Sequence, residues 1–268
     1  MPLQPIHRRR ALGLLGAAGA GVVLAACGGS KDDASSSTVV PSKATSTDVG
    51  RTTGTTGTTG AVRPDMFDDA ARCTVTPVAI EGPYYIDVDK IRSDIREDRE
   101  GRKLRVAARI LASDGCTPVR DAVFEIWHCD AAGLYSGFEA ASTGGGGGPG
   151  GPQGGRATTT DAKRYLRGAQ VTNADGIAEI TTIYPGWYRG RTVHIHAKVF
   201  ISSREVLTTQ LYFDDALNGT VFASAPYTAH PGRDTFNDDD SIFSDQTILT
   251  VSKDGDGYLG LIGMGVKS

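Results

Sequence analysis

Sustained helical periodicity is missing from this sequence of 268 residues, and so is a strong excess of either charge. The 28 Lys and Arg side chains are nearly balanced by 31 Asp and Glu, which leaves a formal net charge of -3. This balance gives no indication of binding to nucleic acid or another polyanion. The longest apolar run, Ala11–Ala26, is too short and too rich in Gly and Ala for a good membrane span. The length fits a single domain of about 200 residues with appended segments.

The N-terminal segment resembles an export signal. Arg8–Arg10 precede the apolar run, as in twin-arginine signals. The run ends in Leu24–Cys27, which resembles a bacterial lipobox and implies cleavage before Cys27 and lipidation of its thiol. Ordinary signal cleavage nearby and an uncleaved anchor are the alternatives. We therefore interpret residues 1–27 as the signal of an exported protein, a cell-surface lipoprotein or a secreted one, whose membrane contact is a lipid on Cys27.

Two low-complexity stretches are expected to stay outside any core. Residues 28–65 are mostly Ser, Thr, Gly, Asp and Lys, and 51–60 repeat Thr-Thr-Gly. Such a segment cannot bury enough apolar surface to offset its ordering entropy, so we expect a flexible tether. Residues 143–155 are rich in Gly and Pro and indicate a loop. The domain itself is expected over 66–268.

Cysteines are scarce, with four in the whole chain. With Cys27 set aside, Cys73, Cys116 and Cys129 remain. An exported domain permits a disulfide, and three thiols leave one unpaired. The sequence does not determine the pairing. Cys73–Cys116 is weakly favoured, because Cys129 lies in the strand that leads to the candidate site described below.

Short strand-like segments separated by turn residues indicate an all-β fold, an antiparallel β-sandwich with long irregular loops. The expected strands are 104–111, 122–128, 164–172, 177–183, 192–202, 206–213, 246–252 and 258–266. The last two are expected to form a hairpin. Residues 218–244 are expected to be irregular, and the acidic run Asn237–Asp240 indicates a solvated loop more than a calcium site.

The stretch Tyr184–His196 carries the strongest chemical signal. His194 and His196 are two residues apart, so in a strand both imidazoles project from one face, while Ile195 packs on the other. Two neutral imidazoles on one face can form half of a metal site. The alternative is a pair of hydrogen-bonded histidines on a half-buried strand.

Tyr135 and Tyr188 complete a candidate ligand set with the two histidines. A phenol has an unperturbed pKa near 10, so a tyrosine ligand requires a strongly Lewis-acidic ion such as Fe(III). Two phenolates and one hydroxide would balance the three positive charges of that ion. Taken singly, each tyrosine could instead be a loop or core aromatic, and the hypothesis depends on their joint occurrence.

Four motifs in order resemble the intradiol ring-cleavage dioxygenases of catechol, hydroxyquinol and protocatechuate. These motifs are Glu81–Tyr85, Trp127–Gly137, Tyr184–His196 and Leu207–Gln210. The resemblance covers about 73–250. It implies cleavage of a small aromatic diol with O2 to a cis,cis-muconate-type product, with both oxygen atoms incorporated.

The resemblance also assigns roles to residues. Tyr135 and His194 would be equatorial Fe(III) ligands, and Tyr188 and His196 axial ones. Tyr188 would leave the ion and take up a substrate proton. Arg191 and Gln210 would both lie beside the bound substrate. Arg191 would stabilise negative charge on the ring. The pocket wall would be Gly82, Pro83 and Tyr84, together with the turn 129–134.

Few Lys or Arg residues lie in the motifs that would form that wall. The carboxylate of protocatechuate would need a fixed Arg or Lys, so we expect a preference for catechol, hydroxyquinol or alkyl-catechols. Arg189 is the one nearby candidate left, since Arg191 is assigned to the reacting edge. A monomer and a homodimer are both compatible with the sequence. The competing hypothesis is a non-catalytic surface lipoprotein whose sandwich binds carbohydrate or a protein, because fold alone does not give function.

Overall fold

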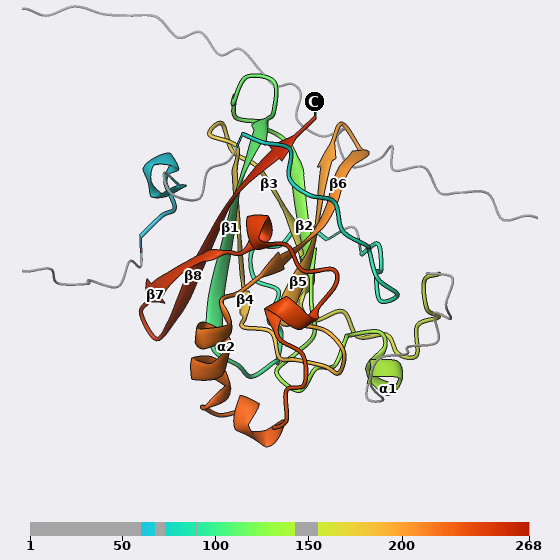
Figure 1. The fold of residues 1–268 in the computed structure, drawn as a ribbon. Coiled ribbons are helices and arrows are strands. Elements are labelled where there is room, and N and C mark those ends of the chain that lie inside the picture. The colour runs from blue at the N-terminus through green and yellow to red at the C-terminus, as the bar shows by residue number, and fades with distance from the viewer. Residues whose placement is uncertain (1–59, 68–72, 89, 143–154, 268) are drawn as a thin grey trace, which may run out of the picture. The chain divides into compact units, whose positions relative to one another are not determined.

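The computed structural model describes residues 60–67, 73–88, 90–142 and 155–267 (Figure 1). The expected signal segment at 1–27 lies outside the described residues, as do most of the tether and nearly all of the Gly-rich run at 143–155. Across the described ranges, every helix is too short or too polar to cross a membrane.

Two four-stranded sheets make up the domain (Figure 1). The first has the order β4 (Ile177–Ile183), β1 (Lys103–Ala112), β8 (Gly257–Val266), β7 (Thr250–Asp254). The second has the order β3 (Arg167–Val171), β2 (Val123–Trp127), β5 (His194–Ile201), β6 (Arg204–Tyr212). The expected β-sandwich is confirmed, including the β7–β8 hairpin. All pairs of these strands are antiparallel except β1 and β8, which run parallel.

The main core lies between the sheets, because successive side chains of a strand point to opposite faces and one face of each sheet turns inward. Phe124 and Ile126 of β2 and Ile195 and Ala197 of β5 join this core with residues of β1 and β8. The other face of β2 and β5 is buried as well. A second cluster covers it, made of Tyr84, Tyr85, Trp127, Cys129, Tyr135 and Phe138. The candidate residues lie in this covering layer.

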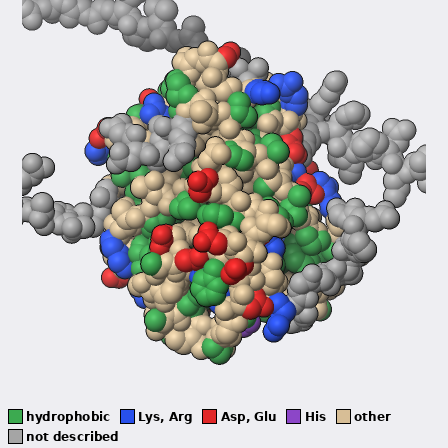
Figure 2. All heavy atoms as spheres, viewed as in Figure 1, with side chains coloured by type: hydrophobic (Ala, Val, Ile, Leu, Met, Phe, Trp, Pro, Cys, Tyr) green, Lys and Arg blue, Asp and Glu red, His purple; other side chains and the backbone are tan. Residues whose placement is uncertain are grey.

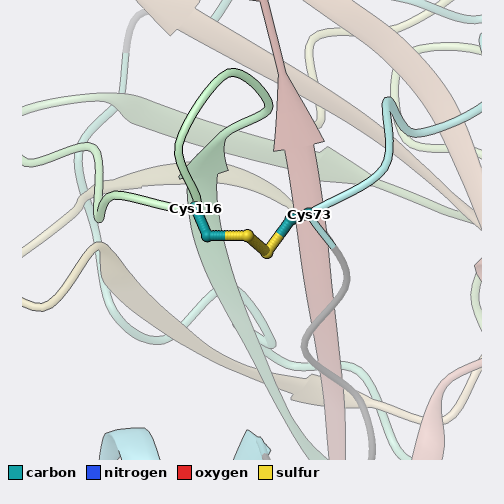
Figure 3. Close-up of a disulfide and its surroundings, with 2 residues drawn as sticks. All are labelled: Cys73 and Cys116. Carbon is teal, nitrogen blue, oxygen red and sulfur yellow. A yellow bond between two sulfur atoms is a disulfide. The ribbon is translucent and has the colours of Figure 1, made fainter.

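A disulfide joins Cys73 to Cys116, as the sequence weakly favoured (Figure 3). Cys129 is free and buried. Beyond the disulfide, Thr76 N donates to Gly265 O on β8 at 2.9 Å. The segment that leads to the predicted pocket wall is therefore fixed to the first sheet at its start.

In the described part of the chain, helices are few and short. They are α1 (Glu139–Ser142), α2 (Asp215–Phe222) and the 3-10 turns η1 (Pro64–Phe67), η2 (Tyr227–Ala229), η3 (Asn237–Asp239) and η4 (Asp245–Thr247). The expectation of irregular structure over 218–244 was wrong for the second half of α2. Asp214 caps this helix by accepting from Ala216 N at 2.8 Å. Only two residues of α2 are buried, so its sequence shows no clear apolar stripe.

The ordered domain extends a few residues before the expected start at 66. Phe67 of η1 is fully buried against Ala107 and Leu259. Gly60 O accepts from the guanidinium of Arg105 at 2.9 Å. Residues 60–65, expected in the tether, thus pack on the first sheet.

Candidate metal centre

His194 and His196 project together from the outer face of β5, as the period of two predicts. Both are buried, and their Nε2 atoms lie 3.2 Å apart. Ile195 between them points into the sandwich core. The strand therefore presents two imidazole nitrogens to one point in the covering layer.

Each imidazole is held in a defined orientation. His194 Nδ1 donates to Thr192 O at 2.6 Å, which leaves a lone pair on Nε2. The His196 ring stacks on Trp127 with centroids 4.9 Å apart and planes 6° apart. Burial, with the nearby charge of Arg191 second, lowers the pKa of both rings well below its usual value. Both are thus neutral imidazoles, the form that binds metals.

Tyr188 reaches the same point from a tight turn. The turn closes between Tyr188 and Arg191, with Gly190 at φ +79°. Tyr188 Oη lies 3.1 Å from His194 Nε2. Burial raises the pKa of this phenol to about 12.

Tyr135 approaches from the loop after β2. In the turn before it, Asp130 Oδ1 accepts from Ala132 N and Leu134 N. Gly133 passes so close to Trp187 that a Cβ would lie 2.4 Å from its carbonyl oxygen. The Tyr135 ring lies 5.7 Å from that of Tyr188 and 6.2 Å from that of His196, centroid to centroid.

The Tyr135 hydroxyl is buried, and among the described residues no partner meets it with hydrogen-bond geometry. Burial is also the main reason why its pKa lies well above 10. An unpaired buried hydroxyl costs about 1–3 kcal/mol. A bound cation would remove this cost, since it gives the oxygen a partner in its ionised form.

These donors fit a metal ion. Donor atoms bound at about 2.1 Å and at right angles lie about 3 Å apart. The separations of 3.1 Å for Tyr188 and His194 and 3.2 Å for His194 and His196 match this spacing. Within the described ranges, no three His, Cys, Asp or Glu side chains form a metal-binding group. An ion here would therefore depend on the tyrosine oxygens, a donor set suited to Fe(III).

Arg191 and Gln210 lie beside the cluster and contact each other. Gln210 is opposite His196 in the β5–β6 register. Its Oε1 accepts from Arg191 Nη2 at 2.5 Å and from the Tyr212 hydroxyl at 3.0 Å. Its Nε2 donates to Ile80 O at 3.0 Å. The amide therefore links the guanidinium to the segment that carries the pocket wall.

The predicted wall residues contact the same rings. A Cβ on Gly82 would lie 3.1 Å from His196 Cε1. Tyr84 packs on Tyr135 with centroids 4.9 Å apart, and Pro83 O accepts from Ala157 N at 2.8 Å. The turn 129–134 has two kinds of neighbours. Cys129 packs in one cluster with Tyr84 and Tyr135. Asp130, Ala131 and Ala132 line a cleft of about 430 Å³ that includes none of the four candidate ligands.

Three features of the site were not predicted from the sequence. Trp127 is the stacking partner of His196, and Thr192 fixes His194 through its carbonyl. Asp240 binds Arg191 and is discussed below. His128, in contrast, behaves as the sequence indicated. Its two nitrogens lie 2.7 Å from Cys129 O and Thr182 Oγ1, so it is a structural hydrogen-bonder.

Comparisons with known proteins identify the family of the chain. A family model described as "Dioxygenase" matches residues 80–230. Catechol 1,2-dioxygenase 1 of Acinetobacter lwoffii is 31% identical over 160 residues, which cover 50% of this chain and 45% of the relative. Chlorocatechol 1,2-dioxygenase of Cupriavidus pinatubonensis is 28% identical over 171 residues, which cover 53% and 58%. The chain spans about half the length of the curated relatives it matches.

Solved structures extend the likeness over most of the described domain. An intradiol ring-cleavage dioxygenase from Tetranychus urticae has a TM-score of 0.65 and 30% identity, covering 73% of this chain and 95% of the other. The dioxygenase domain of a dioxygenase carbohydrate-binding protein fusion from Streptomyces sp. SirexAA-E has a TM-score of 0.52 and 28% identity, covering 72% and 98%.

Proposed function

Because this chain belongs to the intradiol ring-cleavage dioxygenase family, we propose that it cleaves a catechol-type diol with O2 and a bound non-haem Fe(III) ion. The product would be a cis,cis-muconate-type dicarboxylate. The observation that carries this proposal is the convergence of Tyr188 Oη, His194 Nε2 and His196 Nε2 beside the unpaired Tyr135 hydroxyl.

Four residues would hold the ion: Tyr135, Tyr188, His194 and His196. When bound, Fe(III) supplies the Lewis acidity that stabilises the deprotonated phenols and the deprotonated diol. The histidines contribute no charge, since burial keeps them neutral. Thr192 and Trp127 keep their rings oriented for that role.

Tyr188 is suited to handle a substrate proton. It is partly exposed, whereas Tyr135, His194 and His196 are buried. The ordinary basicity of a phenolate is high, and burial raises the pKa of Tyr188 further, to about 12. Ionised as a ligand, its oxygen would therefore be basic enough to accept a proton from an incoming diol hydroxyl. This assigns proton uptake to the most exposed of the four residues.

Arg191 would stabilise negative charge that develops on the ring. Its side chain is about 15% exposed, and its charge acts on Tyr188 and His194. A fixed cation in a partly dehydrated site stabilises developing charge more strongly than one in water. Gln210 keeps the guanidinium in place through the 2.5 Å hydrogen bond.

The substrate class follows from the cations near the site. Arg189 is 74% exposed and its Nε lies 3.8 Å from Asp234 Oδ2, so it is directed to another partner. Lys198, two residues after His196, is paired with both Glu81 and Glu205. Both cations thus already face carboxylates of this chain. We therefore propose a preference for catechol, hydroxyquinol or alkyl-catechols over protocatechuate.

Oxygen uptake by the iron-loaded protein tests both parts. We expect consumption of O2 with catechol or hydroxyquinol, and a lower kcat/KM with protocatechuate. Tyr188→Phe should abolish uptake. Tyr258→Phe is the matched control, since that residue lies on β8 and its hydroxyl accepts a hydrogen bond from Lys253 Nζ at 2.9 Å. Absence of uptake with every diol would contradict the activity. A higher kcat/KM for protocatechuate, lost in Arg189→Ala, would contradict the substrate preference.

We also propose that the protein is exported, with a lipid on Cys27. The Arg8–Arg10 and Leu24–Cys27 motifs support this. So does the Cys73–Cys116 disulfide, because disulfides persist mainly in oxidising compartments. Labelled palmitate should enter the wild-type protein in cells and not Cys27→Ala. Equal labelling of both proteins would contradict the anchor.

A further inference from the structure

Asp240 is a buried carboxylate that contacts the proposed substrate-facing arginine. Its side chain is 2% exposed. Oδ2 accepts from Arg191 Nε at 2.8 Å and from Thr192 N at 3.0 Å, and Oδ1 accepts from Ile242 N at 2.9 Å. The carboxylate thus binds both the guanidinium and the backbone between Arg191 and His194.

The neighbouring acids have no such role. Asp238 and Asp239 are exposed, while Asn237 and Asp240 are buried. Figure 2 shows acidic side chains gathered on the face that Figure 1 presents. Asn237 accepts from Thr192 Oγ1 at 2.7 Å and donates to Phe213 O at 2.9 Å. The expectation of a solvated acidic loop is therefore wrong for the two ends of Asn237–Asp240.

The guanidinium of Arg191 is held from two sides. Asp240 binds Nε, and Gln210 binds Nη2 at 2.5 Å. Gln210 is itself held by Tyr212 and by the carbonyl of Ile80. Within the described part of the chain, Nη1 has no hydrogen-bond partner. The two contacts therefore fix the plane of the guanidinium and leave one amino group for another molecule.

We propose that Asp240 is a positioning residue for ring cleavage, which acts through Arg191 by holding its guanidinium in the orientation that faces the substrate. This inference rests on the proposed function. An arginine side chain has many rotamers, and small displacements of a charge that must meet a transition state reduce rates strongly. The ion pair also offsets part of the cost of burying the guanidinium.

A double-mutant cycle tests the proposal on the full-length, iron-loaded protein. Asp240→Asn keeps the shape of the side chain and removes its charge. We expect it to lower kcat/KM for catechol about tenfold or more in the wild-type background, and less than about twofold in the Arg191→Gln background. If turnover of the double variant is too slow to measure, the dissociation constant of 4-nitrocatechol, measured without O2, replaces kcat/KM as the quantity compared among the four proteins. Asp238→Asn, an exposed change of equal charge, should leave both quantities unchanged.

The outcomes separate the two hypotheses. Equal losses from Asp240→Asn in both backgrounds would show that Asp240 has only a structural role, and would overturn the inference. An inactive wild-type protein would overturn the proposed function and the inference together. If Asp240→Asn does not fold, Asp240→Glu replaces it in the cycle, because it keeps the charge but shifts the carboxylate by one methylene. Asp240→Glu should also lower kcat/KM less in the Arg191→Gln background than in the wild-type background.

Discussion

The Nε2 atoms of His194 and His196 lie 3.2 Å apart on one face of β5. In one tautomer of His196 the two rings share a single hydrogen bond at this distance, whereas a cation placed between them would bind a lone pair of each. Tyr188 Oη, 3.1 Å from the first nitrogen, extends the same arrangement. The cluster therefore has the properties of a ligand set more than of a packed core, and the following predictions test this.

Tyr135→Phe should separate function from stability. The hydroxyl is buried and unpaired in the protein without metal, so its removal should leave the melting temperature of the metal-free protein unchanged or raise it. Iron content after loading should fall. Calorimetry and metal analysis measure the two effects. A large loss of stability in the metal-free variant would show that Tyr135 is a structural residue.

Gly82→Ala should weaken iron binding in addition to straining the backbone. Gly82 has φ +74°, where a non-glycine residue costs about 1–2 kcal/mol, and its Cβ would lie 3.1 Å from His196 Cε1. Gly232→Ala is the matched control, since it has φ +93° and open space around the added methyl. Both should lower the free energy of unfolding similarly, but only Gly82→Ala should reduce iron affinity. Equal iron affinity in both variants would contradict the contact.

The buried His128 should make the free energy of unfolding depend on pH. Burial lowers its pKa to about 4, from 6.5. The unfolded state therefore binds the proton first, and the stabilisation present above pH 6.5 is lost as pH falls from 6.5 toward 4. The loss should reach about 3 kcal/mol at pH 4. Denaturant unfolding should measure this: the free energy of unfolding of wild type minus that of His128→Gln should fall by about 3 kcal/mol as pH falls from 6.5 to 4. A difference independent of pH would contradict the assignment.

Loss of the disulfide should destabilise the domain without removing the site. Cys73 and Cys116 are 43 residues apart, which corresponds to about 4 kcal/mol of loop-closure entropy in the unfolded chain. Cys73→Ser should lower the free energy of unfolding toward that extent, with iron binding retained well below the melting temperature. Cys129→Ser tests whether any thiol change has the same effect. Equal destabilisation by both would contradict the entropic account.

The sequence predicted what short-range periodicity controls. Alternation over 192–202 placed His194 and His196 together, and turn residues bounded most strands correctly. Convergence of Tyr135 and Tyr188 could not follow from periodicity, because each tyrosine is on a separate loop. Their place came from the order of four motifs. The parallel pairing of β1 with β8 joins strands far apart in the chain, and no local pattern specifies it.

Asp240 shows why part of the site could not be predicted. It is the third of three consecutive aspartates, and the chain before and after it offers no feature that distinguishes it from Asp238 or Asp239. Its partner Arg191 is 49 residues away. Contacts with Arg191 and Thr192 accompany the burial of this carboxylate, whereas Asp238 and Asp239 are exposed.

The visible spectrum of the protein after loading with Fe(III) tests the central claim most directly. Phenolate-to-Fe(III) charge transfer should colour the wild-type protein wine-red, and anaerobic addition of catechol should change the absorption band. Tyr135→Phe and Tyr188→Phe should weaken or shift the band, and Tyr258→Phe should not. A colourless protein that takes up no iron, or a coloured one whose band is the same in both site variants, would contradict the account.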